Sequence, residues 1–113
     1  MSPSIQRLVR FIKENPDDLF TRFALALEMV KIGEDQKAKT LFESILQIQA
    51  DYPGLSYHFG KLYQRLGALN EAESLFQQGV QFASEKGDLH TKNELLQALE
   101  ELNAFKSFKM RIL

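Results

Sequence analysis

The sequence of 113 residues contains no cysteine, and this absence removes two kinds of structure at once. Without thiols the chain can form neither a disulfide framework nor a thiolate metal site. Proline and glycine are scarce, and most of them lie between apolar-periodic segments rather than inside them. Valine and isoleucine are sparse beside leucine, alanine, glutamine, glutamate and lysine, which are helix formers. Since no alternating strand pattern is present, the sequence predicts a single all-α domain.

Long apolar runs and an excess of one charge are missing as well. The N-terminal residues 1–7 lack the apolar stretch of a secretory signal, and no run approaches the roughly 20 apolar residues of a membrane span. The formal net charge is −1, so no basic excess exists to attract nucleic acid or an anionic membrane. These features predict a cytoplasmic protein that binds neither nucleic acid nor a membrane.

Two segments of the chain superpose without a gap when the sequence is shifted by 34 residues. The matched pairs are Phe23/Tyr57, Leu25/Phe59, Ala26/Gly60, Met29/Tyr63, Gly33/Gly67, Ala38/Ala72, Leu41/Leu75, Phe42/Phe76 and Leu46/Val80. Each segment holds two apolar faces of helical spacing, separated by a glycine that permits a left-handed stop. The sequence therefore predicts two helical hairpins, over residues 19–52 and 53–86.

Residues typical of helix N-termini accompany these hairpins. Asp35 is expected to cap the second helix of the first hairpin. In the second hairpin, Asn70 and Glu73 have the spacing of a capping box. Ser2 and Pro3 fit the N-cap and the first position of a lone helix over residues 4–16.

The hairpins resemble the tetratricopeptide repeat, a helical hairpin of 34 residues. The residues that carry the resemblance are Leu25-Ala26, Phe59-Gly60, Tyr63, Ala38, Ala72, Phe42 and Phe76. Arg22 and Ser56 replace the tryptophan of the family consensus, and Ala50 and Ser84 replace its closing proline. The resemblance implies an α-α superhelix, or solenoid, of about six antiparallel helices, and a role in protein–protein interaction rather than catalysis.

Beyond Ser84 the strict register fails, because polar residues would fall on buried positions. Inserting about two residues places Leu95, Leu96 and Leu99 on the positions of Phe59, Gly60 and Tyr63. Leu95, Leu99 and Leu102 then form one apolar stripe at helical spacing. The opposite face is polar and charged, with Lys92, Glu94, Gln97, Glu100 and Glu101. This pattern predicts a capping helix that covers the last hairpin, within a C-terminal segment over residues 88–113.

No pattern of an enzyme, a cofactor site or a metal site appears. His58 and His90 are not part of a metal-ligand arrangement such as H-E-x-x-H, and no phosphate-binding glycine loop is present. Serine and threonine lie in helical segments with no nucleophile elbow around them. The sequence therefore predicts a non-catalytic protein with no metal and no cofactor.

In the family, the first helices of successive hairpins line a concave groove that binds peptides, and the resemblance implies such a groove here. The candidate groove residues are Phe23, Leu27, Val30, Tyr57, His58, Lys61, Gln64, Arg65, Asn93 and Gln97. Phe23 and Leu27 stand where the chaperone-binding branch of the family has the Lys and Asn that grip a C-terminal carboxylate, so that mode is not expected. The groove should suit a protein or peptide with an apolar anchor and an acidic group near Lys61 and Arg65.

An alternative interpretation assigns the apolar residues of the first hairpin to the core. Phe20, Phe23, Leu27 and Val30 would then pack against the lone N-terminal helix and leave little groove. Phe20 is expected in the core on this ground, whereas both interpretations stay open for Phe23 and Leu27.

The C-terminal residues 103–113 are basic, contain no acidic residue, and carry large apolar side chains at helical spacing. The candidates for self-association among them are Phe105, Phe108 and Ile112. An apolar patch of this kind marks an interface. Three interpretations compete: this C-terminal tail extends the capping helix and folds onto the second hairpin, it pairs with a second copy in a homodimer, or it binds a membrane surface or nucleic acid through its basic residues.

Overall fold

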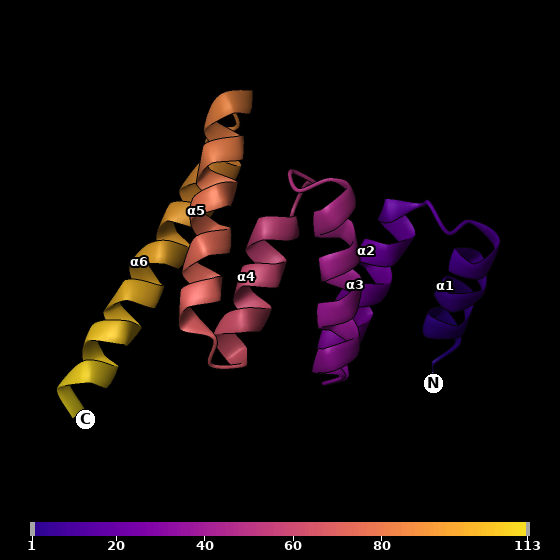
Figure 1. Cartoon of the computed structure of the whole chain (residues 1–113), viewed down its shortest axis with the longest axis horizontal. Coiled ribbons are helices and arrows are strands. Elements are labelled where there is room, and N and C mark those ends of the chain that lie inside the picture. Colours follow the sequence, from indigo (N-terminus) through magenta and orange to yellow (C-terminus); the bar gives the residue numbers. More distant parts are fainter. Residues whose placement is uncertain (1, 113) are drawn as a thin grey trace. The chain divides into compact units, whose positions relative to one another are not determined.

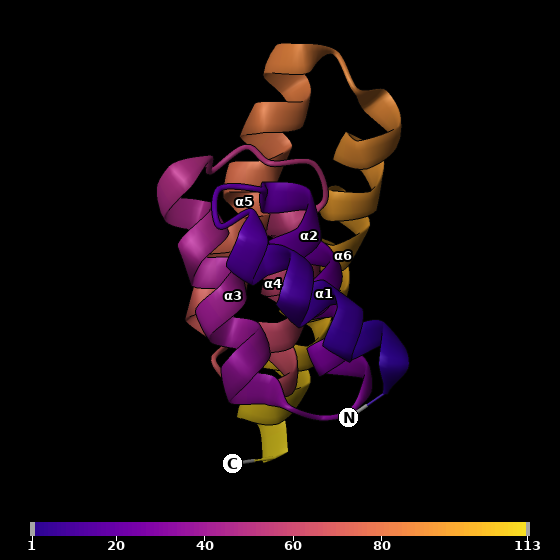
Figure 2. The ribbon, with the colours of Figure 1, turned by 90° about the vertical axis from the view of Figure 1, so that its right-hand side faces the viewer.

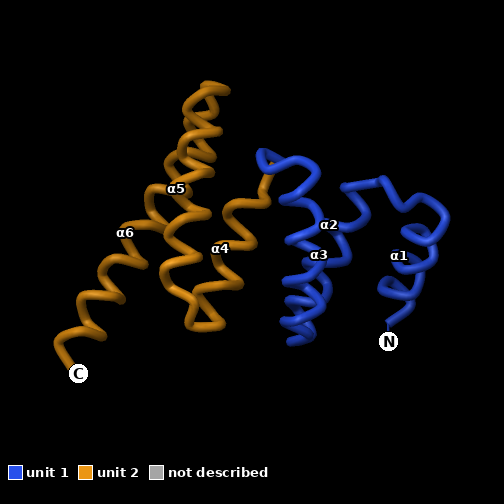
Figure 3. Tube along the Cα trace, in the orientation of Figure 1, with its two compact units in different colours: residues 1–52 blue, residues 53–113 orange. Residues whose placement is uncertain are grey.

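A computed structural model describes residues 2–112. Residues 1 and 113, the first and last of the predicted single domain, lie outside this range. The described chain is all-α with six helices, as the sequence predicts. They are α1 Pro3–Glu14, α2 Leu19–Lys31, α3 Asp35–Ile48, α4 Leu55–Arg65, α5 Leu69–Lys86 and α6 Leu89–Ile112 (Figure 1). The helices belong to two compact units, Met1–Tyr52 with α1 to α3 and Pro53–Leu113 with α4 to α6 (Figure 3). That the whole chain acts as one domain stays a prediction.

Three helices end in the same hydrogen-bonded turn, with a glycine at the same place in each. Gly33, Gly67 and Gly87 have φ angles of 79°, 82° and 69°. In the first of these turns, Gly33 N–H donates to the carbonyl of Val30 at 3.2 Å, and the following N–H donates to the carbonyl of Met29 at 2.9 Å. This is the Schellman motif, which needs a left-handed residue and so favours glycine. The predicted left-handed stops at Gly33 and Gly67 are confirmed, and each turn sends the next helix back antiparallel to the last.

The start of α1 agrees with the sequence. Ser2 is the N-cap, and its Oγ accepts a hydrogen bond from the N–H of Ile5 at 3.2 Å. Pro3 is the first helical residue, where its missing N–H costs no helical hydrogen bond.

The predicted caps of α3 and α5 are wrong. α5 begins at Leu69 with Ala68 as its N-cap, so Asn70 lies inside the first turn and forms no capping box with Glu73. Asp35 is likewise the first residue of α3 rather than its cap. The reason is the Schellman turn, which returns the chain to helical geometry directly after the glycine and the residue that follows it.

Unit 1 places α2 in contact with both α1 and α3. Ala26 of α2 and Ala38 of α3 have no exposed surface, and neither does Phe42, which fills the space beside them. α1 covers this unit with Ile5, which is 1% exposed. The predicted small and large positions of the first hairpin are therefore confirmed.

Phe20 is 70% exposed, so its predicted place in the core is wrong. The buried face of α2 runs through Thr21, Leu25 and Met29, which follow one another at intervals of four residues. Because successive residues of a helix are about 100° apart, Phe20 lies well off this face.

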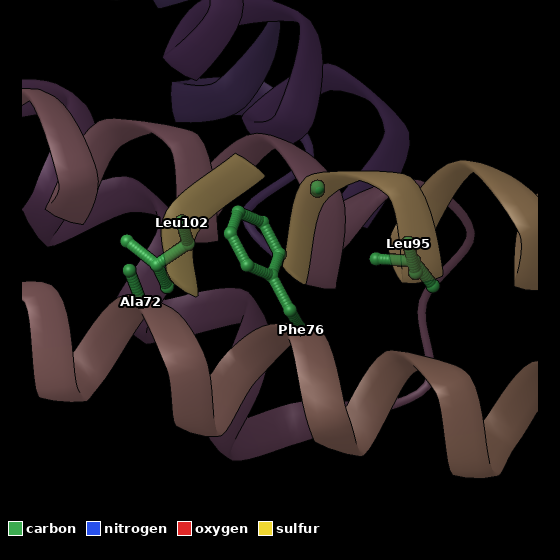
Figure 4. Packing of buried hydrophobic residues seen from close by; sticks show 5 residues of the cluster. Ala72, Phe76, Leu95 and Leu102 are labelled. Carbon is green, nitrogen blue, oxygen red and sulfur yellow. The ribbon is translucent and has the colours of Figure 1, made fainter. Parts of the chain in front are cut away.

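Unit 2 is built around α5, which contacts α4 on one side and α6 on the other. Figure 2 shows α5 and α6 running side by side from the turn that joins them. Their shared core consists of Ala72, Phe76, Leu95, Ala98 and Leu102, and Phe76 points from α5 toward α6 (Figure 4). Leu95 and Leu102 are 1% and 0% exposed, so the predicted buried stripe of the capping helix is confirmed at these positions.

Small residues let α4 approach α5 closely. A Cβ atom at Gly79 would lie 2.6 Å from the Cβ of Ser56, which is too close for two carbon atoms. Ser56 occupies the place of the consensus tryptophan, and the narrow space opposite Gly79 explains why a small side chain is found there. Leu96, which the shifted register aligns with Gly60, is 44% exposed because no helix of the described chain covers that side of α6.

Candidate functional site

α4 divides its residues between the core of unit 2 and an exposed face. Leu55, Ser56, Phe59, Gly60 and Leu62 are buried. The candidate residues Tyr57, Lys61 and Gln64 are half-buried, and His58 and Arg65 are exposed. The helical period therefore separates core from surface in α4 as the sequence predicts, although the binding role of these residues stays a prediction.

Lys61 stands at the centre of this face. Its Nζ atom lies 3.6 Å from Oε2 of Glu101 on α6 and 5.7 Å from the centre of the Tyr57 ring. The ammonium group thus meets a carboxylate on one side and the negative face of an aromatic ring on another. Both ends of the ion pair are partly exposed, so water and salt screen it.

Glu101 is a member of the site that sequence reasoning missed. The shifted register aligns Lys61 with Gln97, and Glu101 lies one helical turn after Gln97. From the sequence alone, Glu101 belongs to the charged face of the capping helix, without a predicted partner. A test for opposite charges one turn on either side of the aligned position would have identified the contact.

His58 is the second polar residue of α4 that faces α6. Its ring packs edge-on against Tyr57, with the ring centres 5.3 Å apart. Partial burial lowers the pKa of His58 below its usual value of 6.5, and the negative charge of Glu94 on α6 opposes this effect. Glu94 is also 3.8 Å from Nε2 of His90, one turn earlier on α6. The face that α4 and α6 share therefore places Lys61 and His58 of α4 opposite Glu94 and Glu101 of α6.

Gln64 is placed less favourably for binding. Its Oε1 atom is buried and has no hydrogen-bond partner among the described residues. An oxygen without accessible surface cannot meet a ligand unless the side chain first rotates. Gln64 is therefore a weaker candidate for contact with a ligand than Lys61 or His58.

The candidates of α2 belong to unit 1 and are half-buried: Phe23, Leu27 and Val30. The Phe23 ring lies 6.0 Å from that of Phe42 and 5.3 Å from that of Tyr52, centre to centre. Phe23 therefore contributes to the aromatic packing of its own unit, through α3 and Tyr52. Its packing against the lone N-terminal helix stays a prediction. A groove that combines these residues with those of α4 stays a prediction.

Asn93 and Gln97 are exposed on α6. They line an open depression along the helix, together with Leu96, Glu100, Glu101 and Ala104. The depression is polar and acidic, apart from Leu96 and Ala104. We name it the α6 depression.

The C-terminal tail continues α6 without a break. Lys106 donates hydrogen bonds to Oδ1 of Asn70 at 3.3 Å and to Oε2 of Glu73 at 2.5 Å. Asn70 and Glu73, which do not form the predicted capping box, therefore hold the tail against α5. The self-association candidates Phe105, Phe108 and Ile112 are 46%, 57% and 67% exposed. The tail thus extends the capping helix, but its largest apolar side chains are not covered by their own chain.

Among residues 2–112, no group of three or more His, Asp or Glu residues is arranged to hold a metal ion. Each helix within residues 2–112 is either too short or too polar to span a lipid bilayer.

Comparison with solved structures identifies the kind of domain. A tetratricopeptide repeat domain protein from Salinibacter ruber is 38% identical to this chain. Its solution structure matches with a TM-score of 0.74 over 79% of this chain and 90% of that chain, and its crystal structure with 0.73 over 78% and 98%. The solution structure of a Bordetella parapertussis protein, 21% identical, matches in fold with a TM-score of 0.84 over 98% of this chain and 96% of that chain.

Among curated proteins, human IFIT1 homolog B is 25% identical over 87 residues. The match covers 77% of this chain but 18% of that relative, so the chain spans less than a fifth of its length. No family model matches the sequence. The identity and coverage of the Salinibacter ruber domain nevertheless show that this chain belongs to the tetratricopeptide repeat family, whose domains are generally non-catalytic modules for protein interaction.

Proposed function

We propose that this chain is a non-catalytic adaptor that binds a segment of another polypeptide on the face shared by α4 and α6. The observation that supports the proposal is the exposed Lys61–Glu101 ion pair beside the Tyr57 ring. An aromatic surface next to a lysine can hold an apolar side chain and an acidic group of the same ligand.

The ion pair between Lys61 and Glu101 determines the free-energy cost of binding an acidic ligand at Lys61. Such a ligand would displace Glu101 from Lys61, and partly exposed ion pairs contribute only about 0–1 kcal/mol. The exchange therefore costs little, because the new carboxylate replaces the old one. Arg65, one turn after Lys61 and exposed, offers a second cation to the same ligand.

An apolar anchor on Tyr57 would supply the larger part of the affinity. Full burial of a Leu or Phe side chain contributes about 1.5–3 kcal/mol, and ordering a flexible peptide subtracts from this gain. These numbers favour binding of moderate strength, in the micromolar range.

Selection from a random peptide library displayed on phage tests the proposal. The chain should enrich sequences that combine an acidic residue with a Leu or Phe, and the variant Lys61→Glu with Arg65→Glu should lose them. A matched control, Lys13→Glu with Lys37→Glu, makes the same change of net charge at exposed positions of α1 and α3. Enrichment of the same peptides by all three proteins would exclude the α4–α6 face as the binding site.

A further inference from the structure

The exposed side of α6 has two halves of opposite character. From Leu89 to Glu101 it carries Glu94, Glu100 and Glu101 against a single lysine, Lys92. The tail that follows carries two exposed cations, Lys109 and Arg111, and no acidic residue; its third cation, Lys106, is bound to Glu73 of α5. The boundary between the halves falls near Ala104, which is small and exposed.

The basic half is also the apolar half. Phe105, Phe108, Met110 and Ile112 are between 46% and 78% exposed, within eight consecutive residues. The buried stripe of α6 ends at Leu102, and one turn later the same side holds Lys106, which reaches α5. Because four large apolar side chains remain uncovered on a short stretch, the tail has the properties of an interface.

We propose that the tail packs antiparallel against the α6 depression of a second copy of this chain, and that the reverse contact forms at the same time. In an antiparallel pair each basic half meets an acidic half, whereas a parallel pair would place like charges together. A two-fold axis near Ala104 makes the contact self-complementary, which is the usual geometry of homodimers.

The helical register supports this arrangement. In this antiparallel pair, Ala104 of one copy lies opposite Ala104 of the other. Phe108, four residues after Ala104, then lies opposite Glu100 of the second copy, which is four residues before Ala104. Its ring then enters the depression between Gln97, Glu100 and Ala104. A residue advances a helix by about 1.5 Å, so Arg111 lies about 4.5 Å along the axis from that Glu100, within reach of its guanidinium group.

Glu100 and Arg111 are available for this contact. Neither forms an ion pair with another residue of the described chain, whereas Glu101 is engaged by Lys61 and Glu73 by Lys106. The Arg111–Glu100 contact would form twice in the dimer and would fix its orientation.

The oligomeric state of the full chain tests the inference. Sedimentation equilibrium should give a species of twice the 13.0 kDa of one chain, and Phe105→Ser with Phe108→Ser should return it to the monomer. A wild-type chain that stays monomeric over the accessible concentration range, or a double variant that stays dimeric, would overturn the proposal. Circular dichroism checks that the variant remains helical, as expected for side chains outside the core.

A charge exchange identifies the proposed partner residues. Glu100→Arg alone and Arg111→Glu alone should each raise the dimer dissociation constant by about tenfold or more, and the two changes together should restore it. Failure of the double change to recover association would show that the two residues do not meet. Glu101 borders both the peptide site and the α6 depression, so separate variants distinguish the two proposals. Phe105→Ser with Phe108→Ser changes the tail alone and tests the dimer, whereas Lys61→Glu with Arg65→Glu changes α4 alone and tests peptide binding.

Discussion

Gly60 of α4 lies so close to Phe76 of α5 that a Cβ atom at Gly60 would be 2.3 Å from Cε1 of the ring. Phe76 has no exposed surface and packs against α6 as well, so its ring cannot move without disturbing the second contact. The equivalent pair of the first hairpin is Ala26 and Phe42, where a methyl group is accommodated. The glycine in the second hairpin therefore fits a tighter approach of its two helices.

Gly60→Leu should destabilise the chain by overpacking this contact. We expect a loss of about 1–3 kcal/mol in the free energy of unfolding, measured by urea denaturation. Ser74→Leu, at an exposed position of the neighbouring helix, is the control and should change stability by less than about 0.5 kcal/mol. Equal stability of wild type and Gly60→Leu would contradict the close approach of α4 and α5.

Gly87→Ala should also destabilise the chain, but through the backbone alone. The residue has a φ of +69°, and a Cβ atom there would meet nothing within 4 Å. An L side chain in this conformation costs about 1–2 kcal/mol, and asparagine tolerates it better than alanine. We therefore expect thermal melting to rank the proteins wild type, Gly87→Asn and Gly87→Ala, in falling order. A lower melting temperature for the asparagine variant than for the alanine variant would argue against the left-handed turn.

Glu101→Gln should strengthen the binding of acidic peptides selected on the wild-type chain. The change removes the carboxylate that competes for Lys61 and leaves a side chain of the same size. An exposed ion pair contributes up to about 1 kcal/mol, so the dissociation constant should fall by about fivefold or less, as measured by calorimetry. Lys61→Gln should raise it. If both variants bind like the wild type, the ion pair is not part of the peptide site.

His58 should titrate below its usual value, and Glu94→Gln should lower the midpoint further. Burial favours the neutral ring, and the Glu94 charge that opposes this effect is removed in the variant. NMR titration of the imidazole resonances measures both midpoints. A midpoint that rises in Glu94→Gln would show that the two side chains do not face each other.

The sign of the accompanying change in stability follows from linkage. Because the pKa of His58 is lower in the folded chain, the unfolded state binds the proton first as the pH falls. The contribution of His58 to stability is therefore fully present above pH 6.5 and is lost as the pH falls from there toward the pKa of the folded state. His58→Gln should remove this part of the pH dependence in denaturation curves.

Much of the fold could be predicted because it depends on local patterns. The 34-residue offset relates Gly33 to Gly67, and both glycines end a helix in the same turn. The spacing of the small and large residues predicts which of them lie at the helix contacts, and the predicted residues are all buried: Ala26, Ala38, Phe42, Ala72 and Phe76. Apolar or small residues that recur at helical intervals indicate which positions are buried, since each helix presents one face to its neighbour.

What the tertiary structure alone decided concerns side chains that meet across helices. Asn70 and Glu73 have the spacing of a cap, yet they bind Lys106 from a segment more than 30 residues away. Phe20 looks like a core residue but is exposed, because Thr21 and Leu25 set the buried face of α2. The Lys61–Glu101 ion pair could not be predicted from the aligned register, because it depends on how far α6 is shifted along its axis relative to α4.

Some properties of the C-terminal tail follow from the sequence, and others depend on the tertiary structure. Its apolar and basic character, and the interface which that suggests, were evident from the sequence alone. Only the structure shows that Lys106 faces α5 while Phe105, Phe108 and Ile112 stay exposed, because the rotation of α6 about its axis is set by the packing of Leu95, Ala98 and Leu102. Spacing along a helix determines which side chains share a face, but the packing of the neighbouring helices determines where that face points.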